Sequence, residues 1–178
     1  MSRRYPQAAL AVAMLLTLAA GGCSTDPTKG YTLASMYEAN IDSVAVPIFA
    51  RSRDVYRRDL EFRLTEAVKK RIALDTPYRI RTVSEADTEL TGTIELISQR
   101  VLSSNPDTGH PRDQEILMVL SFTWKDLRSG RTLRDVQNFR VAADYIPDVS
   151  LSEDFFQGSE DLINKAARLI VQQMQRGL

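Results

Sequence analysis

The chain has 178 residues, and its 23 lysines and arginines equal its 23 aspartates and glutamates in number. This balance lacks the basic footprint of a nucleic-acid-binding protein, so we expect no nucleic-acid partner. A single cysteine and a single histidine exclude an intrachain disulfide and argue against a zinc site of the Cys/His type. We therefore expect one packed domain without a metal or cofactor.

The N-terminus carries a secretory signal that ends at a cysteine. Arg3 and Arg4 precede an apolar run over residues 8–20, and two glycines lead to Cys23. The run is shorter than the ~20 residues of a membrane-spanning helix. We interpret residues 1–22 as a lipoprotein signal peptide and Cys23 as the lipidated first residue of the mature chain. Two or more acyl chains anchor a protein stably. Ser24 follows the cysteine where an aspartate would indicate retention in the inner membrane, so we expect the outer membrane, with the domain facing the periplasm.

Residues 23–40 read as a lipidated tether because turn-forming residues dominate their first part. A first strand is predicted over residues 41–49, with Val44, Val46 and Ile48 on one face. Since Pro47 has no N–H group, this strand should lie at an edge of a sheet or end nearby.

Two amphipathic helices are predicted, over residues 56–74 and 154–175. In each of them apolar side chains recur at the three- and four-residue spacing of a single buried stripe. The members of the two stripes are Leu60, Leu64, Ala67, Val68 and Ile72, then Leu162, Ala166, Leu169, Ile170 and Met174. One stripe per helix predicts that both helices pack on the same face of a sheet.

Four further strands are expected, over residues 78–83, 89–102, 115–126 and 133–145. The strands over residues 89–102 and 133–145 are expected to be irregular. Gly92 indicates a bulge or a close approach by a helix, and Val136 is out of phase with its neighbours, which indicates a bulge or a partly covered second face. Alternation places two sets on the core face: Leu90, Ile94, Leu96 and Leu102, then Ile116, Met118, Leu120, Phe122 and Trp124.

The predicted order β-α-β-β-β-β-α defines an α+β fold, a two-layer sandwich with two helices on one face of a mixed sheet of four to five strands. Residues 41–178 form this single domain. The three late strands exceed the usual strand length of ~5–6 residues. We therefore expect them to extend past the helices and expose a tip.

Candidate site residues are few. His110 has no visible catalytic partner, and the acidic stretch at Glu85, Asp87 and Glu89 reads as a solvated turn. Arg128 and Arg131 lie in a predicted tight hairpin with Gly130, where guanidinium groups could hold a phosphate or carboxylate. The alternative is that these arginines provide solubility and discourage edge pairing of the sheet.

Most of the mature chain resembles the lipopolysaccharide-assembly lipoproteins, the LptE-like family. The resembling segments are Cys23, then residues 30–33, 41–49, 60–68, 78–80 and 86–94. The resemblance implies a non-enzymatic outer-membrane lipoprotein that plugs a large β-barrel of the LptD type and aids delivery of lipopolysaccharide to the outer leaflet. A protruding sheet tip with arginines would suit contact with lipid A phosphates; Arg128 and Arg131 are our own candidates for this contact and are not carried over from a family motif.

Two other classes remain open from the sequence. The strand at residues 41–49 and the helix after it also resemble domains of curli-secretion and Tol-associated lipoproteins, which oligomerise or bind cell-wall components. An enzyme would need a polar catalytic cluster, and the sequence shows none.

Overall fold

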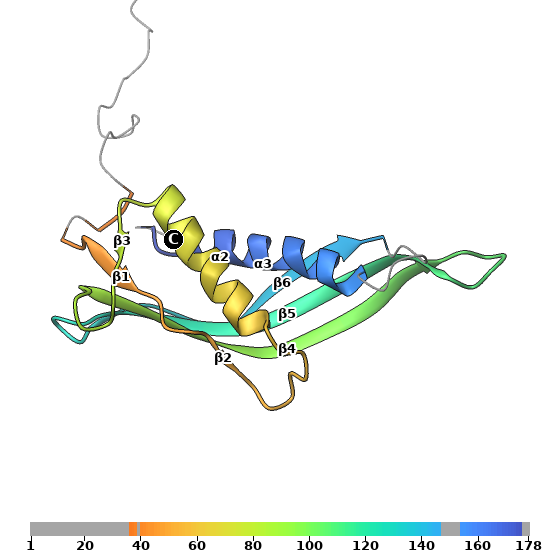
Figure 1. The fold of residues 1–178 in the computed structure, drawn as a ribbon, viewed down its shortest axis with the longest axis horizontal. Coiled ribbons are helices and arrows are strands. Elements are labelled where there is room, and N and C mark those ends of the chain that lie inside the picture. The colour runs from red at the N-terminus through yellow and green to blue at the C-terminus, as the bar shows by residue number, and fades with distance from the viewer. Residues whose placement is uncertain (1–35, 39, 147–153, 176–178) are drawn as a thin grey trace, which may run out of the picture. The chain divides into compact units, whose positions relative to one another are not determined.

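The computed structural model describes residues 36–38, 40–146 and 154–175, which belong to one compact unit, Ser35–Leu178. Its elements follow the chain as shown in Figure 1: β1 (Ser43–Ala45), β2 (Ala50–Arg51), α2 (Leu60–Asp75), β3 (Arg79–Ile80), β4 (Thr88–Ser104), β5 (Pro111–Asp126), β6 (Thr132–Tyr145) and α3 (Asp154–Gln172). Cys23, predicted to carry the lipid, lies outside the described residues.

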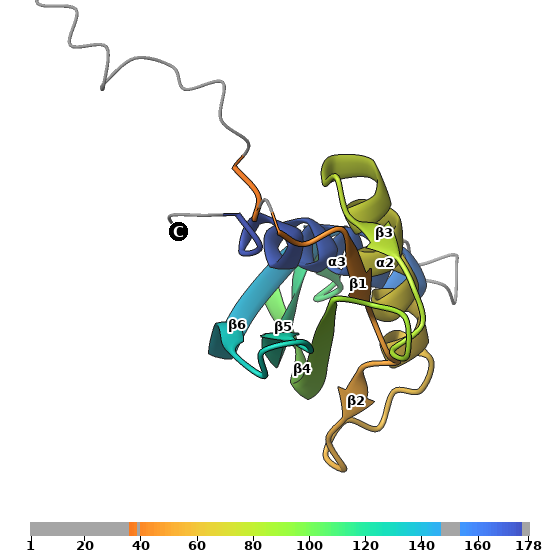
Figure 2. The same ribbon diagram turned by 90° about the vertical axis from the view of Figure 1, so that its left-hand side faces the viewer.

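The strands form one mixed sheet with the order β3-β1-β4-β5-β6, and β2 pairs with β4 beside β1. β1 is parallel to both β3 and β4, whereas β4, β5 and β6 form an antiparallel meander. Because α2 connects parallel β1 and β3, the predicted strand–helix–strand unit is confirmed. Both helices cover the same face of the sheet (Figures 1 and 2), so the α+β sandwich is confirmed, with six strands instead of the four to five expected.

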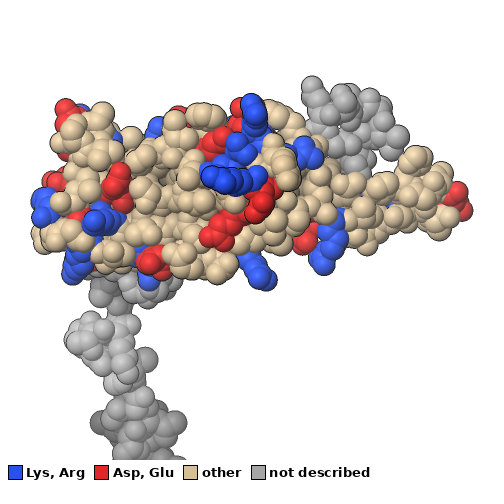
Figure 3. Space-filling model, turned by 90° about the horizontal axis from the view of Figure 1, so that it is seen from below, with Lys and Arg blue, Asp and Glu red and all other residues tan. Residues whose placement is uncertain are grey.

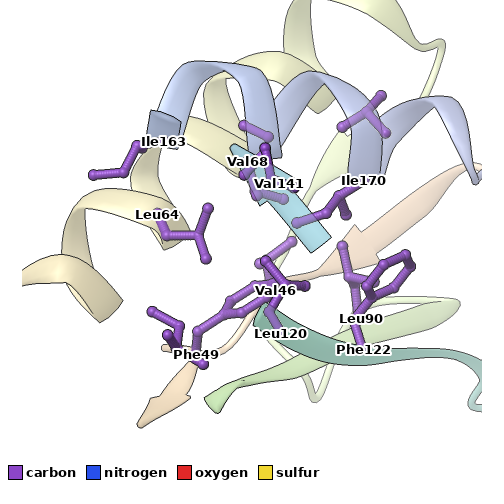
Figure 4. Packing of buried hydrophobic residues seen from close by; sticks show 14 of the residues in the cluster. Val46, Phe49, Leu64, Val68, Leu90, Leu120, Phe122, Val141, Ile163 and Ile170 are labelled. Carbon is purple, nitrogen blue, oxygen red and sulfur yellow. The ribbon is translucent and has the colours of Figure 1, made fainter. Parts of the chain in front are cut away.

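The core lies between the helices and β5 (Figure 4). Leu64 and Val68 of α2 and Ile163 and Ile170 of α3 point toward the sheet, where Leu120 meets them. All five alternating residues of β5 are buried, from Ile116 to Trp124. The predicted core faces of β5 and of both helices are therefore confirmed, and Ala67 and Leu169 are partly buried.

The predicted first strand was wrong in its second half. β1 ends at Ala45, and the chain pairs again only at Ala50 and Arg51. Ile48, expected on the core face, is 57% exposed, and Phe49 is buried in its place. Pro47 explains the break, because its nitrogen cannot donate to a neighbouring strand. The helix also starts four residues later than predicted, after Asp59 in a left-handed conformation with φ 76°.

The core face predicted for β4 was right only up to Ile94. The register shifts between Ile94 and Leu96, and Leu96 pairs with Val119 on the face away from the helices. Leu96 is therefore exposed, at 44%, and Ile97 packs on the core instead. Leu102, which is 46% exposed, lies in a second register shift between Val101 and Ser103. An inserted residue reverses the alternation that follows it. Gly92 does mark a close approach, but its neighbour is Phe49 and not a helix.

The bulge expected in β6 is confirmed. Leu120 pairs with Phe139 and Phe122 with Val136, so the two partners on β6 are three residues apart. Asn138, one of the two residues between these partners, has φ 53°. The bulge brings Val136 and Phe139 to the same face, where both pack against the core.

The two hairpins of the meander lie at opposite ends of the sheet (Figure 1). The β4–β5 hairpin extends beyond the helices, as expected of a long meander. The β5–β6 turn, with Gly130 at φ 72°, lies at the other end, near the start of β1. The arginines predicted for the projecting tip thus lie at the opposite end from it.

Candidate functional site

The candidate anion site begins with the β5–β6 turn, which Asp126 holds closed. Its carboxylate accepts hydrogen bonds from the backbone N–H of Arg128 at 2.9 Å and from the hydroxyl of Ser129 at 2.7 Å. These two bonds lower the pKa of Asp126, led by the hydroxyl of Ser129. Gly130 then lets the chain return into β6 with a positive φ. The turn therefore presents Arg128 and Arg131 from a defined backbone.

Arg128 is engaged within the domain. Its guanidinium donates to the backbone carbonyl of Asn40, and it lies 3.7 Å from the carboxylate of Asp87 and 4.0 Å from that of Asp126. Two carboxylates around one guanidinium leave no excess of positive charge there. Arg128 therefore joins the turn to the chain that enters β1, although its side chain remains 57% exposed.

Asp87 is the centre of this cluster, and the solvated-turn interpretation missed its role. Its Oδ2 accepts from the hydroxyl of Ser43 at 2.8 Å and from the backbone N–H groups of Asp42 and Ser43, both at 3.0 Å. These bonds, foremost the one from the Ser43 hydroxyl, lower the pKa of Asp87, and the charge of Arg128 adds to the effect. The signal in the sequence is an acidic residue directly before a strand. Its role could be recognised only if the neighbouring strand, β1, were known.

Arg131 differs from Arg128. It is exposed, and within the described part of the chain its guanidinium makes no hydrogen bond or ion pair. Arg134, the next arginine, donates from Nε to the carbonyl of Gln173 at 3.1 Å. Arg131 is therefore the arginine of this turn that remains available to an external phosphate or carboxylate.

The projecting β4–β5 hairpin has another character. His110 is exposed there, and only its backbone N–H contacts a side chain, the hydroxyl of Thr108 at 3.4 Å. Val101, Leu102 and Ile146 near this end are exposed apolar residues. Over the described residues, no three His, Cys, Asp or Glu side chains are grouped as metal ligands require. The same residues contain no helix long and apolar enough to span a membrane.

The described part of the chain forms a two-layer α+β domain, and the charged side chains at its β5–β6 turn suit the binding of an anion. The profile of the family LptE, lipopolysaccharide-assembly, matches residues 41–178. The chain belongs to this family of non-enzymatic lipoproteins. The resemblance predicted from the sequence is thereby confirmed.

Three of the solved structures to which the chain is similar carry the description of a bacterial lipoprotein. Lipoprotein B of Nitrosomonas europaea is 14% identical, with a TM-score of 0.49, 79% of this chain covered and 90% of that chain. The rare lipoprotein B of Shewanella oneidensis is 20% identical, with a TM-score of 0.45 and coverage of 73% and 92%. A lipoprotein of Caulobacter crescentus is 16% identical, with a TM-score of 0.47 and coverage of 72% and 86%. No curated protein sequence matches the chain.

Proposed function

We propose that this protein is an outer-membrane lipoprotein that plugs a β-barrel lipopolysaccharide translocon, helps the barrel assemble and aids delivery of lipopolysaccharide to the outer leaflet. The observation that carries the proposal is the family match over the whole predicted domain, residues 41–178. The barrel partner is of the LptD type, and the protein performs no covalent chemistry itself.

The anchor and the site support the proposal in different ways. Lipidation at Cys23 would hold the mature chain on the periplasmic side of the outer membrane. Arg131, whose guanidinium has no partner among the described residues, would bind a lipid A phosphate, because the fork of an arginine matches phosphate geometry. Arg128 would be a second, weaker contact, because its side chain is 57% exposed although its charge is balanced by Asp87 and Asp126.

The test is an affinity purification of the full lipoprotein from membranes in mild detergent, followed by mass spectrometry. Recovery of a large outer-membrane barrel in near-equal amount is the expected result. Recovery of the protein alone, or as a ring of its own copies, would overturn the plug role. A ring would support the secretion or cell-wall class of lipoprotein.

A further inference from the structure

The loop of residues 52–59 lies between β2 and α2, at the edge of the sheet where β2 pairs with β4. Figure 1 shows it below β4, and Figure 2 shows it projecting outward beyond β2. We call residues 52–59 the β2–α2 loop. It belongs to neither the arginine turn nor the projecting hairpin, and the proposed function assigns it no role.

The first half of this loop is held by the fold. The N–H of Ser52 donates to the carbonyl of Ile94 at 2.9 Å, and the N–H of Val55 donates to the carbonyl of Ser52 at 3.1 Å. The Val55 side chain is only 2% exposed. Arg51 donates to the carbonyl of Val55 and lies 3.4 Å from the carboxylate of Glu61. The loop is thus fixed to both β4 and α2.

The second half has its own attachment. The Arg57 guanidinium carbon lies 3.3 Å from the centroid of the Phe155 ring, and its Nη2 donates to Gln99 at 3.0 Å. A cation above an aromatic face is a favourable contact. Since both halves are attached, little conformational freedom remains to be lost when a partner binds.

The side chains that point outward from this loop are exposed. Tyr56 is 88% exposed. Arg53 and Arg58 are exposed, and their guanidinium groups contact no acceptor or carboxylate among the described residues. Tyrosine and arginine are the residue types, with tryptophan, that dominate binding energy in protein interfaces. A rigid loop thus presents one tyrosine between two unpaired arginines.

The charges around the loop indicate the chemistry of the partner. Asp54 and Asp59 alternate with the arginines along the loop, and both are exposed. Figure 3 shows basic and acidic groups side by side near the middle of the face seen from below. A uniformly anionic surface of phosphates would complement only the arginines of the loop, whereas a protein surface that offers carboxylates next to a donor group complements both signs.

We propose that the β2–α2 loop is a protein-docking site, in which Tyr56 packs into the partner and Arg53 and Arg58 pair with carboxylates of the partner's surface. This proposal goes beyond the plug role and does not depend on the partner being a barrel.

The experiment places a photoreactive phenylalanine analogue at position 56 of the full lipoprotein, expressed in its own cells. A second strain carries the analogue at Leu74, which is 68% exposed at the end of α2. The expected result is a protein adduct at position 56 that is absent at position 74, with a crosslinked partner peptide close to aspartate or glutamate. Replacing Arg53 and Arg58 together by glutamate should reduce the adduct about ten-fold or more, because two interface arginines are lost.

The matched control is the Arg81→Glu/Arg112→Glu variant, which changes the net charge equally at two exposed arginines outside the loop. It should leave the adduct unchanged. Changing the mapped acidic residues to lysine should restore the adduct to the Arg53→Glu/Arg58→Glu variant, which a merely structural effect of the reversal would not do.

Three outcomes overturn the docking proposal: an adduct with lipopolysaccharide or phospholipid only, no adduct at position 56, or an equal loss in the control variant. Its failure is distinguishable from failure of the plug role. A barrel that co-purifies while position 56 gives no protein adduct removes the docking site alone. A charge-dependent adduct with a protein other than a barrel removes the barrel as the loop's partner and leaves the docking site intact.

Discussion

The ring of Phe49 lies directly over Gly92. A Cβ atom at position 92 would lie 2.7 Å from Cδ1 of Phe49, a separation that real Cβ atoms do not reach. The backbone N–H of Phe49 donates to the hydroxyl of Thr65 at 3.0 Å. Phe49 thus connects the segment after β1 to both β4 and α2, and the glycine provides the space for this contact.

Gly92→Ala should therefore destabilise the domain by about 1–3 kcal/mol, because the added methyl group overpacks the site. Urea unfolding followed by circular dichroism measures the loss. Phe49→Leu is the control, since it shortens the side chain above position 92. The double variant should lose less unfolding free energy than the sum of the losses in the two single variants. A loss equal to that sum would contradict the direct contact.

The Asp87 carboxylate makes stability depend on pH in a defined direction. Its pKa is lowered in the folded state, foremost by the hydroxyl of Ser43. The stabilisation is therefore complete above the unfolded pKa of about 3.9 and is lost as the pH falls through the lower folded pKa. Asp87→Asn removes this titration. We expect the difference in unfolding free energy between wild type and Asp87→Asn to shrink between pH 6 and pH 3. A constant difference would show that the charge of Asp87 does not matter.

Arg131 and Arg128 should respond differently to charge reversal. Arg131→Glu should weaken lipopolysaccharide binding by about ten-fold, the worth of one charge-assisted contact, without changing the melting temperature. Arg128→Glu should also lower the melting temperature, because its partners Asn40, Asp87 and Asp126 belong to the domain. Binding assays paired with thermal unfolding separate the two effects. Unchanged binding of the double variant at unchanged stability would remove both arginines from the lipid site.

Cys23→Ala should release the protein from membranes, because the acyl chains have no other attachment residue in a chain with one cysteine. Membrane fractionation with detection of the domain measures the release. If the variant still fractionates with outer membranes, a protein contact alone must retain it.

The strands that alternate without interruption were the ones predictable from the sequence. In β5 the five residues from Ile116 to Trp124 alternate and all are buried. In β4 the same reasoning failed after Ile94, because Leu96 stays in phase with Leu90 and Ile94 in the sequence although the bulge before it reverses the alternation that follows. The bulge in β6 was predictable because Val136 is visibly out of phase.

The candidate site was less predictable, because its groups come from distant segments. Asp87 and Ser43 are 44 residues apart, and Arg128 reaches Asn40 across 88 residues. Sequence spacing shows such partners only when the order of the strands is known. The attachment of the β2–α2 loop has the same origin, since Arg57 meets Gln99 and Phe155 only in the folded domain.

Trp124 is the only tryptophan of the chain, and it is buried, with 3% of its surface exposed. Its ring centroid lies 5.8 Å from that of Tyr78, which in turn lies 5.6 Å from that of Tyr37, near the beginning of the described chain. The domain therefore contains its own optical probe of the segment that leads toward Cys23. Displacing Tyr37 would change the packing of Tyr78 against Trp124, so we expect movement of this segment to be followed by fluorescence without attaching a dye.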